Sequence, residues 1–317
     1  MIEATGLSKR YGGAVAVDDI SFSVAPGKVT GFLGPNGAGK STTCRLMVGL
    51  DKGSGTTRFD GAQYVDLEVP MRSVGMLLEA KAFHPTRTAR NHLKMLCAAN
   101  GLDSARADEC LALVGLSEVA KKKPNGFSLG MAQRLGLAAA MLGNPKTLIL
   151  DEPGNGLDPQ GIQWLRDLLR FFASEGRTVL VSSHLLSEME LMADHVVVIG
   201  RGRLIADCPT SEFIGRGSQQ WVVVRTPTPN PLTGVLTQRG IQWVIESDGS
   251  LRVNSADAAT VGDAAHVAGV ALHELSVHRS SLEQAFLELT GDANQFAGQA
   301  ATTQQGQPGF FLPGGRS

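Results

Sequence analysis

The chain has few aromatic residues and no excess of basic charge. Aromatic residues make up 5% of its 317 residues, and 29 lysines and arginines stand against 30 aspartates and glutamates. A protein that neutralises a phosphate backbone needs a basic surplus, and one that stacks bases needs aromatic side chains. The composition therefore argues against a nucleic acid as partner.

The chain also lacks paired cysteines and long apolar runs. Its four cysteines are scattered without a C-x-x-C pair, which is typical of reduced thiols in a cytoplasmic protein rather than of disulfides or a zinc site. No apolar run approaches the roughly 18 residues that span a bilayer, and the N-terminal segment has no apolar signal core. We therefore expect a cytoplasmic chain, with any membrane crossing left to another protein.

The length suggests about two domains. Over residues 1–210, short β-branched runs alternate with helical patterns, which indicates an α/β domain on a largely parallel sheet. The apolar runs predict buried strands, and i, i+3, i+7 spacing predicts one amphipathic helix. The strands are expected at residues 29–33, 147–150, 178–181 and 196–199, and the helix at 161–174.

A second unit is expected at residues 220–291, after a polar segment at 209–220 that indicates a linker. Its pattern predicts strands at 221–226, 241–246, 251–254 and 271–278, with helical segments after the first and the third. The order β-α-β-β-α-β is typical of a small α+β ferredoxin-like domain, which we expect the helix at 281–289 to close. The Gln-, Gly- and Ala-rich residues 292–317 form a tail that we expect to be disordered.

Residues 34–42, G-P-N-G-A-G-K-S-T, match the phosphate-binding pattern G-x-x-x-x-G-K-[ST] between a predicted strand and a predicted helix. Backbone N–H groups in such a loop converge on a phosphate at the helix N-terminus. Lys40 would add positive charge at the β- and γ-phosphates, and Ser41 a hydroxyl for Mg²⁺. The expected nucleotide-binding residues of the loop are Gly34, Asn36, Gly37, Ala38, Gly39, Lys40, Ser41 and Thr42.

Two carboxylates, Asp151 and Glu152, end the apolar run L-I-L-D-E-P. A carboxylate at the end of a buried strand can hold Mg²⁺ directly or through water, and its neighbour can polarise the attacking water as a general base. Alone, this pattern is explained as well by an ordinary strand-to-turn boundary. Together with the phosphate loop it becomes strong evidence for a nucleotide hydrolase.

Upstream of these carboxylates, the segment F-S-L-G-M-A-Q-R by itself indicates a helix capped by Ser128. With the two motifs above, the chain resembles the ATP-binding subunits of ABC transporters, with Ser128 and Gly130 on the signature positions of that family. Asp158 matches its D-loop and His184 its switch histidine. The resemblance implies a P-loop NTPase fold with a helical subdomain.

Further matches extend this resemblance to the base of the nucleotide and to the partner chains. Tyr11 stands where the family has an aromatic residue that stacks on adenine. In the family, ATP with Mg²⁺ lies between the phosphate loop of one copy and the signature of another. We therefore expect a homodimer in which Asp158 makes a dimer contact. The homodimer would drive a separate transmembrane permease from the inner face of the cell membrane. Residues 72–93 would form the surface that receives this permease.

One departure from the family pattern is Glu79, which stands where the family usually has a glutamine. A carboxylate there can still bind Mg²⁺ or water. Glu79 and the form S-L-G-M resemble the bacterial exporters of daunorubicin and bacitracin type, which implies export of a drug, an antibiotic or another hydrophobic compound.

Two alternatives remain. The first is a soluble ABC ATPase acting on ribosomes or DNA, but the second cassette, coiled-coil insertion or zinc cluster of such proteins is absent from this sequence. The second is a regulatory module without hydrolysis, which the presence of Glu152 and His184 disfavours. The remaining histidines have no metal-ligand spacing and are expected at satisfied surface positions; they are His84, His92, His195, His266, His273 and His278.

Overall fold

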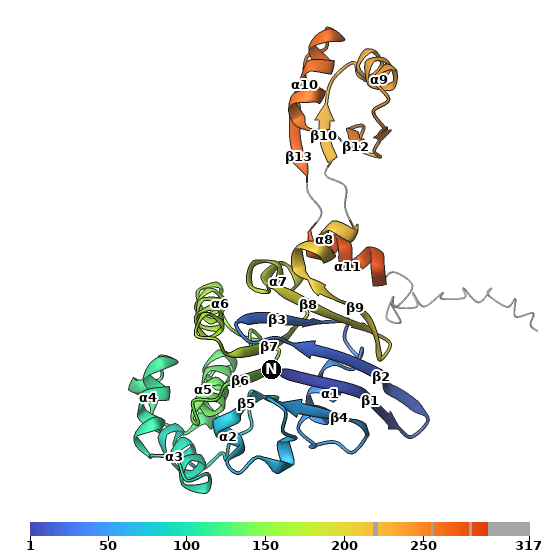
Figure 1. The fold of residues 1–317 in the computed structure, drawn as a ribbon. Coiled ribbons are helices and arrows are strands. Elements are labelled where there is room, and N and C mark those ends of the chain that lie inside the picture. The colour runs from blue at the N-terminus through green and yellow to red at the C-terminus, as the bar shows by residue number, and fades with distance from the viewer. Residues whose placement is uncertain (218–220, 255, 279–280, 291–317) are drawn as a thin grey trace, which may run out of the picture.

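A computed structural model describes residues 1–217, 221–254, 256–278 and 281–290 of the chain (Figure 1). Its first part is built on a six-stranded sheet in the order β5-β6-β7-β3-β8-β9. The five strands from β5 to β8 are parallel, and β9 runs antiparallel to β8. The strands are β3 (Lys28–Leu33), β5 (Val74–Leu77), β6 (Thr147–Asp151), β7 (Thr178–Ser183), β8 (His195–Gly200) and β9 (Arg203–Pro209).

Apolar side chains cover both faces of this sheet. In β6, Leu148 and Leu150 face one core cluster and Ile149 faces the other. A strand buried on both faces reads as a continuous apolar run rather than an alternating one, which is why the sequence shows it clearly. All four strands expected in this part are confirmed, as is the amphipathic helix, which begins two residues earlier than predicted.

One face of the central sheet is covered by a three-stranded antiparallel sheet, β2-β1-β4, together with the first helix. Its strands are β1 (Ile2–Tyr11), β2 (Ala14–Val24) and β4 (Ser54–Phe59). This sheet is not among the elements that the sequence predicts. Its strands alternate buried and exposed residues, and the polar positions hide the strands in a search for apolar runs.

Helices cover the other face, where the larger core cluster lies. The helices of this first part are α1 (Lys40–Met47), α2 (Pro70–Ser73), α3 (Ala89–Ala99), α4 (Ala105–Leu113), α5 (Leu129–Met141), α6 (Pro159–Ser174), α7 (Leu186–Met192) and α8 (Thr210–Gly217). Three single-turn 3-10 helices lie between them, η1 (Tyr64–Asp66), η2 (Ser117–Val119) and η3 (Pro124–Gly126). Helices α3, α4 and α5 pack on one another and form the expected helical subdomain (Figure 1).

The segment expected to be a linker is largely helical, so that prediction is wrong. Residues Thr210–Gly217 form α8, and residues 218–220 lie outside the described part of the chain. Phe213 explains the difference, because its fully buried side chain belongs to the core cluster of the first part. Ile214 of the same helix also packs against that cluster, and burial of these apolar side chains holds an otherwise polar helix on the core.

The second part is a four-stranded antiparallel sheet in the order β11-β12-β10-β13 with its own core cluster. Its elements are β10 (Trp221–Arg225), α9 (Pro229–Gln238), β11 (Trp243–Ile245), β12 (Leu251–Asn254), α10 (Ala258–Val267) and β13 (Glu274–His278). The expected β-α-β-β-α-β order and ferredoxin-like arrangement are therefore present, with shorter second and fourth strands than predicted. The expected tail at 292–317 lies outside the described residues.

The last helix, α11 (Leu282–Thr290), does not close this small sheet as expected. It packs against α8 and α7, and its Leu282, Ala285 and Phe286 belong to the core cluster of the first part. The backbone N–H of Leu282 donates to Glu190 Oε2 of α7 at 2.9 Å. An amphipathic pattern predicts an apolar helix face but does not say which core receives it.

Phe286→Ala tests the placement of α11. Phe286 is 7% exposed, and replacing a buried phenylalanine by alanine costs about 3–5 kcal/mol. We expect this loss in the free energy of unfolding of β8 and β9, measured by hydrogen exchange during a urea titration. Leu287→Ala on the exposed side of α11 is the control and should change it by less than about 0.5 kcal/mol. Unchanged exchange in β8 and β9 with Phe286→Ala would contradict the placement.

Among the described residues, no helix combines the length and the apolar character that crossing a bilayer requires.

Candidate functional site

The loop between β3 and α1 forms a hollow of about 220 Å³ at the N-terminus of α1. Gly37 and Gly39 bend the chain there with φ angles of +80° and +106°, in the region that favours glycine. The first N–H groups of a helix have no hydrogen-bond partner within the helix, so in such a hollow they can bind an anion. The hollow is lined by Ala16, Pro35, Asn36, Gly37, Gly39, Lys40, Ser41, Thr42 and Glu152.

The two other predicted residues of the loop, Gly34 and Ala38, support the hollow from behind. A Cβ on Gly34 would lie 2.6 Å from the carbonyl oxygen of Ile199, so only glycine fits against β8. Ala38 is buried, and its carbonyl accepts from the N–H of Gly202.

Lys40 is a buried ammonium at the edge of the hollow. It is 7% exposed, and its Nζ donates to the carbonyl of Gly34 at 2.7 Å and lies 3.7 Å from Glu152 Oε1. A buried charge needs such partners, because its desolvation otherwise costs several kcal/mol. The ammonium is thereby held where it can reach a bound phosphate.

Asp151 lies at the end of β6, beside Ser182 in the neighbouring strand β7. Its carboxylate is 8% exposed and accepts a hydrogen bond from the Ser182 hydroxyl. Parallel strands place their carboxyl ends at one edge of the sheet, which is where α/β proteins bind ligands. The structure therefore puts Asp151 at the same edge as the phosphate loop, as the sequence predicted.

Glu152 is held in an unusual backbone conformation, with φ at +49°. Its N–H donates to the Ser182 hydroxyl at 2.9 Å, and its carbonyl accepts from Gln133 Nε2 at 2.8 Å. A non-glycine residue with positive φ costs of order 1–3 kcal/mol and persists only where its surroundings fix it. Both supporting residues, Ser182 and Gln133, stand in segments that the sequence singles out, but those segments indicate other residues for the chemistry and not these two contacts.

The carboxylate of Glu152 lies between the side chains of His184 and Lys40. His184 Nδ1 is 2.7 Å from Glu152 Oε2, and Lys40 Nζ is on the opposite side, close to Oε1. Because an ionised carboxylate only accepts, the imidazole donates here. The structure thus brings together the predicted base, the predicted switch histidine and the phosphate loop.

Ser128, Gly130 and Asp158 are not among the residues that line the hollow of their own chain. Ser128 is exposed and caps α5, as predicted, by accepting from the N–H of Met131 at 3.2 Å. A Cβ on Gly130 would come within 2.7 Å of the Gly156 carbonyl. Asp158 caps α6 by accepting from the N–H of Gly161 at 2.8 Å. The contact with a second copy stays a prediction for all three.

Tyr11 is a half-exposed residue at the end of β1. Its hydroxyl donates to Asp51 Oδ2 at 2.8 Å, and Lys9 Nζ lies 4.8 Å from the ring centroid. The hydrogen bond to Asp51 raises the pKa of Tyr11, while Arg45 and Tyr11 lower the pKa of Asp51. Tyr11 does not line the phosphate hollow, so stacking on adenine stays a prediction.

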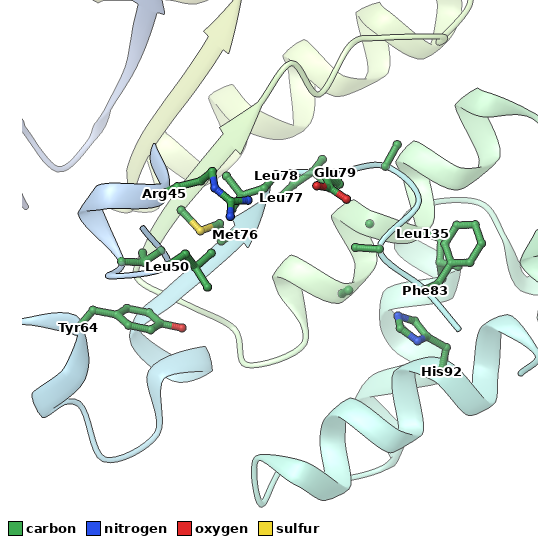
Figure 2. Close-up of a pocket in the computed structure, with 15 residues that line it drawn as sticks. Arg45, Leu50, Tyr64, Met76, Leu77, Leu78, Glu79, Phe83, His92 and Leu135 are labelled. Atoms are coloured by element: carbon green, nitrogen blue, oxygen red, sulfur yellow. The ribbon is translucent and has the colours of Figure 1, made fainter. Parts of the chain in front are cut away.

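Glu79 follows β5 and lines a different cavity, an apolar groove of about 380 Å³ (Figure 2). The groove lies between the end of α1, the segment after β5, and helices α3 and α5. Its lining includes Leu50, Met76, Leu78, Phe83 and Leu135, with Arg45 and Glu79 as charged members.

His92, on α3, also lines this groove and is not the surface residue that the sequence suggested. It is 6% exposed, and its Nδ1 has no hydrogen-bond partner among the described residues. Burial is the main cause that lowers the pKa of His92, so the ring is neutral at pH 7. The helical spacing of residues 89, 93 and 97, all buried on α3, was the available signal, since His92 lies next to that face.

Comparisons with known proteins agree with this geometry. Residues 17–155 match the family model described as ABC transporter, and residues 220–283 match a domain of unknown function. The chain is 35% identical over 300 residues to the uncharacterised ABC transporter ATP-binding protein YhcH of Bacillus subtilis, covering 93% of this chain and 97% of that one. It is also 35% identical to the bacitracin transport ATP-binding protein BcrA of Bacillus licheniformis, covering 92% and 97%.

Two further comparisons cover mainly the first part of the chain. The lantibiotic transport ATP-binding protein SrtF of Streptococcus pyogenes is 38% identical over 65% of this chain and 90% of its own. A solved ATP-binding subunit of an ABC transporter superposes with a TM-score of 0.63 at 29% identity, covering 68% of this chain and 92% of that one.

The chain belongs to the ATP-binding proteins of the ABC transporter family. It is an ATPase. The hollow at the N-terminus of α1 is the predicted site of its nucleotide. Relatives that match over nearly the full length are ABC transporter proteins, so the ribosome- or DNA-acting alternative is not favoured.

Gly39→Ala tests the geometry of the phosphate hollow. A Cβ there would lie 2.4 Å from the Ala16 carbonyl at a φ of +106°, so the first turn of α1 must shift. We expect ATP affinity, measured by calorimetry, to fall at least about tenfold, which corresponds to about 1.4 kcal/mol. Gly13→Ala, with no atom within 4 Å of its added Cβ, should leave affinity unchanged. Equal affinities for the two variants would contradict this account of the hollow.

Proposed function

We propose that this ATPase powers a separate transmembrane permease that exports an antibiotic or another hydrophobic compound. The bacitracin and lantibiotic transport proteins described above support this cargo class. The observation that carries the proposal is the separation, within one chain, between the phosphate hollow and the exposed signature residue Ser128. A second copy is then needed to bring Ser128 to the nucleotide.

In this homodimer, Ser128 and Gly130 of one copy contact the γ-phosphate held by the other. His184 donates to the same phosphate from its own chain, and Asp158 lies at the contact between the copies. Hydrolysis removes the γ-phosphate and with it the contacts that favour the closed dimer, so the copies separate. Closure and opening are the motion passed to the permease.

The residues at the sheet edge fit a Mg²⁺ ion bound with ATP. Asp151 offers a buried carboxylate at the sheet edge from which the phosphate loop leaves, and Ser41 of the hollow offers a hydroxyl. Such hard oxygen atoms are the ligands that Mg²⁺ takes. The ion would neutralise charge on the β- and γ-phosphates. Glu79 lines the apolar groove and not the phosphate hollow, so its contact with the ion stays a prediction.

The groove beside Glu79 is the proposed docking site of the permease. Its apolar lining suits an amphipathic cytoplasmic segment, and its position between α1 and α3 links such a segment to the helix that begins at the phosphate hollow. Docking there would hold the chain on the inner face of the cell membrane.

Glu152→Gln tests the base and the homodimer together. Without its general base, ATP turnover should fall about 100-fold to 10,000-fold, because general-base catalysis contributes that much. The bound ATP then persists, so size-exclusion chromatography with Mg-ATP should show a dimer where the parent chain shows a monomer. Glu175→Gln, an exposed partner of Arg177, is the matched control and should behave as the parent. If Glu152→Gln hydrolysed ATP at the rate of the parent chain, Glu152 would not be the general base.

Phe83→Asp tests the groove. Phe83 lines the groove and not the phosphate hollow, so basal ATPase activity should be unchanged. The stimulation of ATPase activity by the permease should fall at least about tenfold, and so should the amount of permease that co-purifies with the variant. The reason is that a carboxylate would be buried in an apolar contact. Phe171→Asp, at an exposed position on α6, is the same substitution outside the groove and should retain both. If Phe83→Asp kept both the stimulation and the co-purification, the permease would dock at another surface.

A further inference from the structure

The small C-terminal sheet ends in a strand that is open to pairing. Among the described residues, β13 pairs with β10 on one side and forms the edge of the sheet (Figure 1). Its sequence, E-L-S-V-H, contains no lysine and no proline, two residues that often protect an exposed edge, and Glu274 is its one acidic residue. Leu275 and Val277 are 37% and 44% exposed. Such an edge is a template for another strand.

The strand is complementary to a copy of itself. When two such strands run antiparallel about Ser276, all five residues are paired. Glu274 faces His278 of the other strand, Leu275 faces Val277, and Ser276 faces its own copy. Directly opposed acid–base and apolar pairs each stabilise a sheet by about 0.2–1 kcal/mol, so this register is favoured over its neighbours.

The polar row of β13 is already ordered by its own sheet. The Ser276 hydroxyl donates to Glu274 Oε1 at 2.8 Å and lies 3.1 Å from His278 Nε2. Behind this row, Arg225 donates to Glu274 Oε2 at 3.0 Å, and the ring of Trp221 stacks on His278 with centroids 5.8 Å apart. The side chains that would face a second strand therefore lose little freedom on pairing.

We propose that β13 pairs with β13 of a second copy about Ser276, joining the two small sheets into one eight-stranded sheet. The proposal rests on the homodimer of the proposed function and adds a second contact to it. Both contacts are isologous, so they can share one two-fold axis. Pairing of β13 with the opposite edge strand, β11, would instead propagate from copy to copy without closing, and β11 has only three residues.

A short edge pairing is weak alone and gains from a second contact between the same chains. Once ATP holds the two copies together, the strands meet at the high effective concentration of an intramolecular event. We therefore expect β13 pairing to be stronger with Mg-ATP than without nucleotide.

Ser276→Cys in the full-length chain tests the register. Opposed residues in an antiparallel pair have Cα atoms about 4.5–5.5 Å apart, within the range that a disulfide bridges. Mild oxidation should yield a covalent dimer on a non-reducing gel, with at least about fivefold more in Mg-ATP. The native cysteines are all buried, so they add little background. Ser247→Cys, exposed in the turn after β11, is the matched control and should give no such dimer.

The facing charges are tested in the Ser276→Cys background. His278→Lys places a cation opposite Glu274, whereas His278→Glu places two carboxylates together, and both variants lose the stacking on Trp221. We expect covalent dimer with His278→Lys and about tenfold less with His278→Glu at low salt. Circular dichroism confirms that both variants fold. Equal yields from the two would overturn the proposed register.

The outcomes separate this inference from the proposed function. If Glu152→Gln dimerises with ATP but Ser276→Cys links no better than Ser247→Cys, the β13 contact is wrong and the ATP-bound homodimer stands. If Ser276→Cys links while Glu152→Gln stays monomeric, the β13 contact stands without the nucleotide-bound homodimer. Failure of both removes the β13 pairing together with the dimer on which it rests.

Discussion

The register of the parallel strands β3, β7 and β6 is the constraint on which the site depends. Ser182 of β7 lies opposite both Phe32 of β3 and Asp151 of β6. The three chain segments that leave these strands therefore emerge at one level of the sheet edge. They carry the phosphate loop, the pair Asp151–Glu152, and His184. A shift of one residue in either pairing would turn the side chains to the opposite face and separate the acid, the histidine and the loop.

Ser182 turns this alignment into a specific geometry. Its hydroxyl donates to Asp151 and accepts from the N–H of Glu152, so one side chain fixes two consecutive carboxylate residues. Gln133 of α5 holds the Glu152 carbonyl from the helical side. Because Ser128 caps α5, the helix that carries the signature also supports the backbone of the proposed base. The local strain at Glu152 is thus maintained by the sheet and by α5 together.

The sequence predicts those features of the fold and the site whose signal lies within one short segment of the chain. The phosphate loop, the carboxylate pair and the buried strands are contiguous runs, so adjacent residues are enough to recognise them. The structure places them as expected. The roles of Gln133 and His92 depend on contacts between segments far apart in the chain, which the pattern within one segment does not specify. The same holds for α8 and α11. Phe213 and Phe286 show that each helix has an apolar residue to bury, but only tertiary packing decides that both bury it in the first core.

This packing ties the small sheet to the ATPase at both ends. The chain enters the sheet through α8 and leaves it into α11, and these two helices contact each other on the core of the first part. Helix α11 also touches α7, which begins two residues after His184. The Glu190 carboxylate of α7 sits at the N-terminus of α11, where it meets an otherwise unpaired N–H and the positive end of the helix dipole. The helices before and after the small sheet therefore pack beside the element that follows the switch histidine, so pairing between two such sheets would act on the ATPase through α8 and α11.

A contact between the two small sheets must be weak enough to release, because a pairing that survived loss of the γ-phosphate would hold the dimer closed and stop turnover. The short strand and solvent-exposed charge pairs of β13 meet that requirement, since exposed pairs contribute no more than about 1 kcal/mol each.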